Sequence, residues 1–253
     1  MILLLETIVR RWYAVAFIAG FFWAASSERG WKRALRFYAI ASVVALIFEY
    51  TSTHSGFPYG NYSYTGLTRG DELYISNVPA FVPVAHAVLM WAGRSIAIVG
   101  FRARSRAAIP WLAALGTVLV DMVVDPVSLH GGDWFLGDMY RWETAKGYLG
   151  VPLTNFLGWY FVAWLVFFVD EALDVGRAER SFDAIRGITL AFSVMIFNVV
   201  IALGIRQWRV ALSGMVITAA VALMCLPTLR EMWSTRDATG PPEPTSGEPR
   251  TDP

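Results

Sequence analysis

Two aspartates four residues apart, Asp121 and Asp125, are the side chains of this chain best suited to chemistry. They close an apolar run over 107–125, just before Pro126, where we expect that helix to stop. Residues i and i+4 share a helical face, so the carboxylates would project side by side. A carboxylate at membrane depth costs about 3 kcal/mol on insertion scales and therefore marks a functional site by default. The plainer interpretation is a solvated helix-end pair, and function is favoured over it for Asp121, one turn deeper.

Composition assigns the chain to a membrane class. It is 56% hydrophobic, 15% aromatic and 16% charged, with a mean hydropathy of +0.47, which is more apolar and less charged than soluble proteins. The net charge of +1 and the lack of a basic stripe argue against nucleic acid as a partner. The single cysteine, Cys225, allows no intramolecular disulfide. Arg10 and Arg11 follow the first apolar residues, so we expect a retained helix and not a secretory signal.

Seven apolar runs are long enough to span a bilayer as helices. They lie at 12–26, 35–51, 78–100, 107–125, 152–170, 185–204 and 209–229. The sequence therefore predicts an all-α fold, a polytopic membrane helix bundle of about seven transmembrane helices in one domain, 1–233. The Pro-, Gly- and Glu-rich segment 234–253 is expected to be a disordered tail.

The distribution of Lys and Arg predicts the orientation. The connections after the first, third and fifth runs, with the C-terminal flank, carry twelve of these residues, against seven on the other side. The positive-inside rule then places the protein in the cell membrane with its N-terminus outside and its C-terminus in the cytoplasm.

The two longest connections, 52–77 and 126–151, fall on the same, outer side of an up-and-down bundle. That side gathers Glu49, Asp121, Asp125 and Asn155, and both connections are rich in glycine and aromatic residues. An interfacial aromatic belt would explain any single ring. Two such connections flanking three carboxylates favour a lid over a cavity.

Two chemistries are disfavoured by the residues themselves. Iron oxygenases need several imidazole or carboxylate ligands in a fixed geometry, whereas His54, His86 and His130 lack ligand spacing. A retinal Schiff base needs a lysine within the membrane, whereas Lys32 and Lys146 both lie in connections. We predict no metal site and no cofactor.

Two other chemistries remain open. Asp121-x-x-x-Asp125 looks like one aspartate-rich motif of membrane prenyltransferases, in which carboxylates hold magnesium and a diphosphate, but a second motif is missing. Alternatively, a carboxylic acid kept protonated in a low-dielectric site could protonate an alkene. Aromatic faces and a second carboxylate would stabilise the resulting tertiary cation until water quenched it.

Four segments carry a resemblance to a known family. They are FEYTSTHSGFPYGNYSYT, NVPAFVPVAH, DMVVDPVSLHGGDW and YLGVPLTNFLGWY, from about Phe48 to Tyr160. Together they resemble the integral membrane carotenoid-biosynthesis family that includes the acyclic carotenoid hydratases of bacteria and haloarchaea. His86 stands where an aromatic residue is expected in that family.

The resemblance implies an enzyme, a cofactor-independent hydratase (a hydro-lyase of isoprenoid metabolism). It would add water to the terminal double bond of an acyclic carotenoid, with membrane lipid around it. We expect Asp121 to be the general acid, Asp125 or Glu49 to position water, and Asn155 to be a hydrogen-bond partner. The substrate-binding candidates are Tyr50, Tyr59, Tyr62, His86, Trp134 and Trp159. A magnesium-dependent prenyltransferase and a non-catalytic carotenoid- or lipid-binding protein are the alternatives.

Overall fold

The computed structural model describes residues 2–144, 146–174 and 184–238. Its helices are α1 (Ile2–Arg10), α2 (Trp12–Arg29), α3 (Trp31–Ser55), α4 (Phe81–Val99), α5 (Ile109–Ser128), α6 (Leu153–Leu173), α7 (Ala184–Gly204) and α8 (Trp208–Ala238). The short elements are β1 (Tyr62–Tyr64), β2 (Tyr74–Ile75), β3 (Val78–Pro79), the 3-10 turn η1 (Gly131–Asp133) and β4 (Tyr140–Trp142). The predicted all-α bundle is confirmed.

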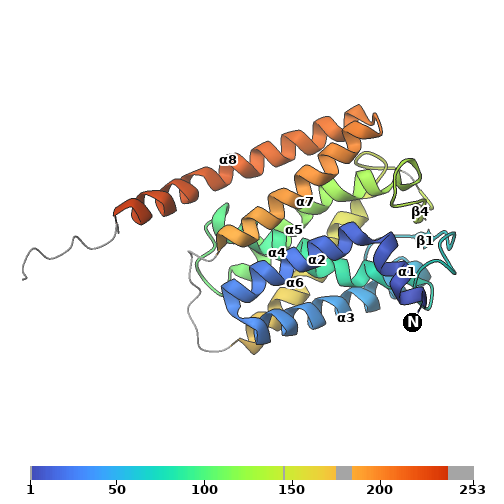
Figure 1. The fold of residues 1–253 in the computed structure, drawn as a ribbon, viewed down its shortest axis with the longest axis horizontal. Helices are drawn as coiled ribbons and strands as arrows, with labels where there is room; N and C mark the ends of the chain where they lie inside the picture. Colours follow the sequence, from blue (N-terminus) through green and yellow to red (C-terminus); the bar gives the residue numbers. More distant parts are fainter. Residues whose placement is uncertain (1, 145, 175–183, 239–253) are drawn as a thin grey trace, which may run out of the picture.

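Six helices are long and apolar enough to cross a membrane within the described part of the chain: α3 to α7, and α8 as far as Ser234. The predicted count of seven is not confirmed. The first predicted run, 12–26, lies within α2, which is separated from α1 at Arg11 and ends in the charged residues Glu28 and Arg29. α2 still runs within the bundle, packed against α3, α4 and α7 (Figure 1).

The flanks of the bundle expose large apolar side chains, among them Val43, Leu157 and Val216, each more than half exposed. Such a surface suits hydrocarbon as its solvent. The predicted tail begins inside α8, which continues to Ala238, and residues 239–253 lie outside the described residues.

The two long connections meet at one end of the bundle, as the sequence predicted. β1 from the first pairs antiparallel with β4 from the second, with Tyr62 opposite Trp142 and Tyr64 opposite Tyr140. The N-terminus lies at this end, and α8 ends at the other (Figure 1).

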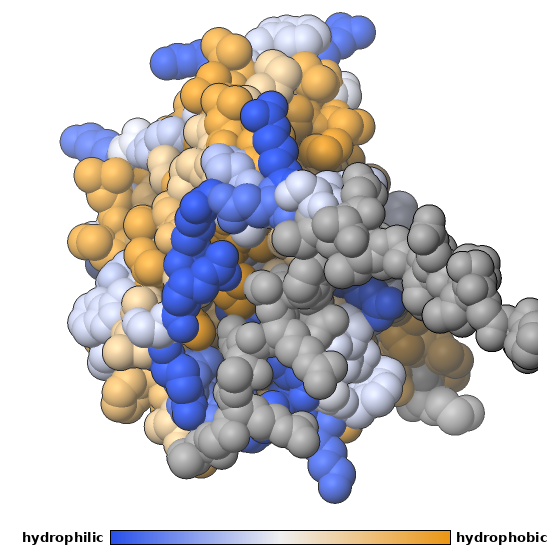
Figure 2. Space-filling model, turned by 90° about the vertical axis from the view of Figure 1, so that its left-hand side faces the viewer, coloured by the Kyte–Doolittle hydropathy of each residue, from blue (hydrophilic) through white to orange (hydrophobic). Residues whose placement is uncertain are grey.

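The opposite end is held by ion pairs. Arg29 of α2 pairs with Asp170 and Asp174 at the end of α6, and the Arg36 guanidinium of α3 lies 2.9 Å from an Asp170 carboxylate oxygen. Figure 2 looks onto this end, where hydrophilic side chains lie across the face and apolar ones spread over the flanks. Buried ion pairs of this kind fix which helices are neighbours.

Helices α4 and α5 touch at a pair of glycines. A Cβ on Gly93 would lie 2.3 Å from the Thr117 backbone nitrogen, and one on Gly116 would lie 2.3 Å from the Gly93 carbonyl oxygen. Only glycine permits so close a backbone approach. Nearer the β1–β4 end, side chains of the same two helices line a cavity instead.

The expectation that Pro126 ends its helix is wrong, because α5 continues to Ser128. Proline removes its own backbone donor but leaves the neighbouring helical bonds possible, and the Leu129 N–H still donates to the Asp125 carbonyl at 3.0 Å.

Candidate active site

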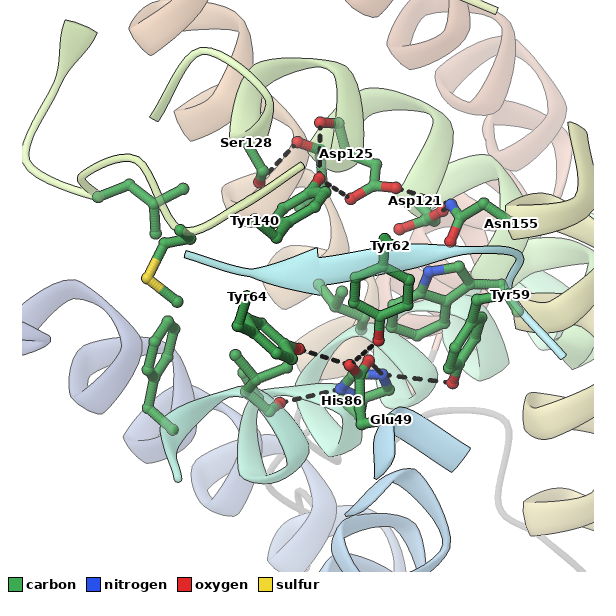
Figure 3. A pocket seen from close by; sticks show the side chains of 18 of the residues that line it. Glu49, Tyr59, Tyr62, Tyr64, His86, Asp121, Asp125, Ser128, Tyr140 and Asn155 are labelled. Carbon is green, nitrogen blue, oxygen red and sulfur yellow. Dashed lines mark hydrogen bonds and ion pairs between the residues drawn. The ribbon is translucent and has the colours of Figure 1, made fainter. Parts of the chain in front are cut away.

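A cavity of about 720 Å³, measured out to its mouth, lies at the β1–β4 end of the bundle (Figure 3). Helices α3, α4, α5 and α6 form its walls, and the two long connections cover it. Its polar lining consists of Glu49, Tyr59, Tyr62, Tyr64, His86, Asp121, Asp125, Ser128, Tyr140 and Asn155, and the rest is apolar or indole surface. Its mixed lining, mostly apolar with a few convergent polar groups, is that of a small-molecule site.

The aspartate pair forms one wall of the cavity. Asp121 is 1% exposed, and the Asn155 amide nitrogen donates to it at 3.1 Å and to Asp125 at 2.7 Å. The Tyr140 hydroxyl donates to the other Asp125 oxygen at 2.6 Å. One amide thus joins both carboxylates across α5 and α6, so the pair acts as a unit.

Glu49 forms the opposite wall with three partners. The hydroxyls of Tyr62 and Tyr64 both donate to its Oε2 atom, and the His86 Nε2 atom lies 3.3 Å from its Oε1 atom. Figure 3 shows this group facing the aspartate pair, with Tyr62 between them.

Both ring nitrogens of His86 have partners. The His86 Nδ1 atom lies 2.9 Å from the Val82 carbonyl oxygen, which only accepts, so Nδ1 carries a hydrogen. The Nε2 atom faces the Glu49 carboxylate at 3.3 Å and the Tyr59 hydroxyl at 3.5 Å, so the imidazole connects Glu49 with Tyr59 and α4.

Aromatic rings line the space between the two walls. The His86 imidazole stacks on Trp159, with ring centroids 4.3 Å apart and planes 14° apart, and Tyr59 packs beside Trp159 at 5.9 Å. Gly158 of α6 allows the connection that carries Tyr59 to approach this helix, because a Cβ on Gly158 would lie 2.8 Å from the Tyr59 Cα atom. The faces of such rings stabilise positive charge.

The β1–β4 ladder aims four of these rings inward. Side chains alternate along a strand, so Tyr62 and Tyr64 of β1 face the same side as their partners Trp142 and Tyr140, whereas Ser63 and Arg141 are exposed. All four inward rings line the cavity.

Three of the inward phenols are held in their neutral form. Burial raises the pKa of Tyr62, Tyr64 and Tyr140 well above the ordinary value, and the adjacent carboxylate, Glu49 or Asp125, raises it further. These hydroxyls therefore remain donors to the acids.

The structure brings most of the predicted site residues together. Eight of them line the one cavity: Glu49, Tyr59, Tyr62, His86, Asp121, Asp125, Asn155 and Trp159. Tyr50 does not, because it sits one position along α3 from Glu49, is 44% exposed and stacks on His54. Trp134 lines an adjoining cavity instead.

The sequence analysis did not select Tyr64, Tyr140 and Trp142. The alternating Tyr-x-Tyr and Tyr-x-Trp patterns at 62–64 and 140–142 were the available signal. In the described part of the chain, no group of three His, Cys, Asp or Glu side chains is placed to hold a metal ion.

The fold and the site define a class: a multi-pass helical membrane protein with buried acids facing an aromatic cavity. A family described as carotenoid biosynthesis protein matches residues 1–228, nearly the whole described chain, and the protein belongs to that family. Its role is therefore in carotenoid biosynthesis, with a carotenoid-related substrate and a membrane environment. No curated protein and no solved structure matches the chain.

Proposed function

We propose that the protein is a hydratase that adds water to the terminal carbon–carbon double bond of an acyclic carotenoid. The observation that carries this proposal is that the pair Asp121 and Asp125 faces Glu49 across one aromatic cavity. Addition of water needs a proton donor, a stabiliser of positive charge and a proton acceptor, and the cavity holds a residue for each role.

Asp121 is the proton donor in this proposal. Two adjacent carboxylates resist being ionised together. Asp125 accepts hydrogen bonds from both Tyr140 and Asn155, which favours its charged form, whereas Asp121 accepts from Asn155 alone among the described residues. The shared proton therefore belongs on Asp121.

The reaction balances without an oxidant or a reductant. The alkene π bond takes the Asp121 proton at its less substituted carbon and leaves a tertiary cation at the other. The cation lies among the rings of Trp159, Tyr59 and Tyr62, facing Glu49. A water oxygen then bonds to the cationic carbon, and its proton returns to the aspartate pair, giving a tertiary alcohol.

Expression in a host that accumulates an acyclic carotenoid tests the proposal, with pigments analysed by liquid chromatography and mass spectrometry. We expect a product heavier by one water from the wild type. Asp121→Asn keeps the shape but holds no acidic proton, so its product should fall by about a hundredfold or more. Asp121→Asn protein must still accumulate in membranes at the wild-type level.

The two alternatives give different products in the same experiment. A magnesium-dependent prenyltransferase at Asp121 and Asp125 would yield a pigment heavier by a prenyl unit when prenyl diphosphate is supplied, and EDTA would abolish it. A carotenoid- or lipid-binding protein would return the pigment unchanged. Either result would replace the hydratase.

A further inference from the structure

A second cavity of about 620 Å³, measured out to its mouth, adjoins the acid cavity. It lies between α2 and α7. Its lining includes Tyr13, Ala14 and Phe17 of α2 and Val194 and Phe197 of α7. The acid cavity instead reaches α3 and α6. The two cavities therefore extend in different directions from the α4–α5 pair.

The two cavities share part of their walls. Six residues line both: Phe81, Ala85, Leu89, Val124, Ser128 and Leu136. Five of these belong to α4 and α5, beyond the close contact at Gly93 and Gly116, and Leu136 belongs to the connection after α5. The two cavities therefore adjoin each other at these two helices.

The second cavity differs chemically from the first. No carboxylate lines it among the described residues. Its polar groups have partners in the protein: the Ser128 hydroxyl donates to the Val124 carbonyl at 3.0 Å, the Asn198 amide to the Val194 carbonyl at 2.9 Å, and the Tyr13 hydroxyl accepts from Arg11. Most of the surface that faces a ligand is apolar and aromatic, including the stacked rings of Tyr13 and Phe197.

We propose that the second cavity binds the conjugated shaft of the carotenoid while its end group lies among the acids. The inference rests on the function proposed above. A conjugated polyene is long, stiff and apolar, so an end group held beside Asp121 must be followed by a continuous apolar channel. In this proposal, the shaft passes from the acids into the second cavity beside the residues of α4 and α5 that line both cavities.

The position of the shaft would also set which bond reacts. A stiff chain that fills the second cavity cannot slide, so a fixed length of it reaches the acids. This arrangement holds the terminal double bond beside the proton donor, which is the orientation effect expected of substrate-positioning contacts.

Ala14→Phe tests the inference, because Ala14 is buried, lines the second cavity and does not line the acid cavity. Two readouts are needed. One is the amount of carotenoid that purified protein retains. The other is the ratio of kcat/KM for a full-length acyclic carotenoid to that for a short acyclic terpene with the same end group. We expect each to fall by about tenfold or more.

Ala24→Phe is the matched control, since it adds the same ring to a fully buried alanine of α2 that lines neither cavity. It should leave the kcat/KM ratio unchanged, and Ala14→Leu repeats the test with less added volume. Unchanged pigment retention, or an equal loss for both substrates in protein that melts like the wild type, would overturn the inference. If the wild type binds pigment that Ala14→Phe does not retain, and neither protein hydrates it, the result would support the shaft-binding cavity and contradict the hydratase proposal.

Discussion

Tyr140 and Asn155 hold the two carboxylate oxygens of Asp125 separately. The Tyr140 hydroxyl belongs to a connection outside the helices, so the β1–β4 ladder supplies one of the hydrogen bonds to an acid of α5. Removing that one hydroxyl should change the chemistry more than the fold.

We expect Tyr140→Phe to lower kcat by about tenfold or more while KM stays near the wild-type value. The ring is retained, so the cavity keeps its shape, but Asp125 loses the hydrogen bond that keeps the proton on Asp121 in the proposed mechanism. Tyr148→Phe is the control, because that hydroxyl contacts Ser213 and does not line the cavity. Equal kinetics for the two variants would contradict the role given to Tyr140.

The buried phenols also predict an alkaline titration. Their pKa is raised in the folded protein, so above about pH 10 the unfolded chain loses protons that the folded one keeps. Their contribution to stability is therefore complete below about pH 10 and declines as the pH rises further. Ultraviolet absorbance of phenolate should show Tyr59, Tyr62, Tyr64 and Tyr140 titrating last, together with loss of helical circular dichroism. Complete phenolate formation in a still-helical protein would refute this.

At the scale of elements, the junction between α1 and α2 ties the cavity cover to the bundle. Arg11 is 1% exposed and forms a two-pronged ion pair with Glu72, with nitrogen–oxygen distances of 2.6 and 2.7 Å. Its other terminal nitrogen donates to the Leu136 carbonyl at 2.7 Å. Leu136 lines both cavities, so this arginine holds part of the cover in place.

Arg11→Met should destabilise the protein by about 3–5 kcal/mol, because it leaves Glu72 charged and buried without a partner. The neighbouring pair gives a matched control: Arg10 and Asp71 are 2.5 Å apart but partly exposed. Arg10→Met should therefore cost only about 0–1 kcal/mol. Thermal unfolding in detergent measures both, and equal midpoints would show that Arg11 does not act as described.

The elements also show what sequence could and could not supply. The four-residue spacing of Asp121 and Asp125 was enough to place them on one helical face. The alternation of an up-and-down bundle was enough to place Glu49 and Asn155 at the same end as this pair. The contacts of Tyr64 and Tyr140 depend on the register of β1 with β4, which local sequence does not determine. Trp134 lines the second cavity, between α2 and α7, and the position of that cavity follows from helix packing that local sequence does not determine. Arg11 looked like a topology signal and is in fact a buried ion pair.

At the scale of the whole molecule, the orientation in the membrane stays a prediction. Cys225 is buried, so a Cys225→Ala background leaves introduced thiols as the labelling sites. Arg141→Cys lies at the cavity end and Lys32→Cys at the opposite end, and both positions are exposed. In intact cells, a membrane-impermeant thiol reagent should label Arg141→Cys alone, and Lys32→Cys only after permeabilisation. The reverse pattern would place the acids on the cytoplasmic side.

The β1–β4 ladder carries a consequence for biosynthesis of the protein itself. Its two strands are separated by α4 and α5 in the chain. Both helices must therefore be synthesised before Tyr64 can pair with Tyr140. Until then, the part of the site on α3 and α4 is incomplete, because the residues that face Glu49 across the cavity are not yet in place. We expect nascent chains that stop before β4 to be recognised by membrane quality control, whereas chains that extend past Asn155 escape it.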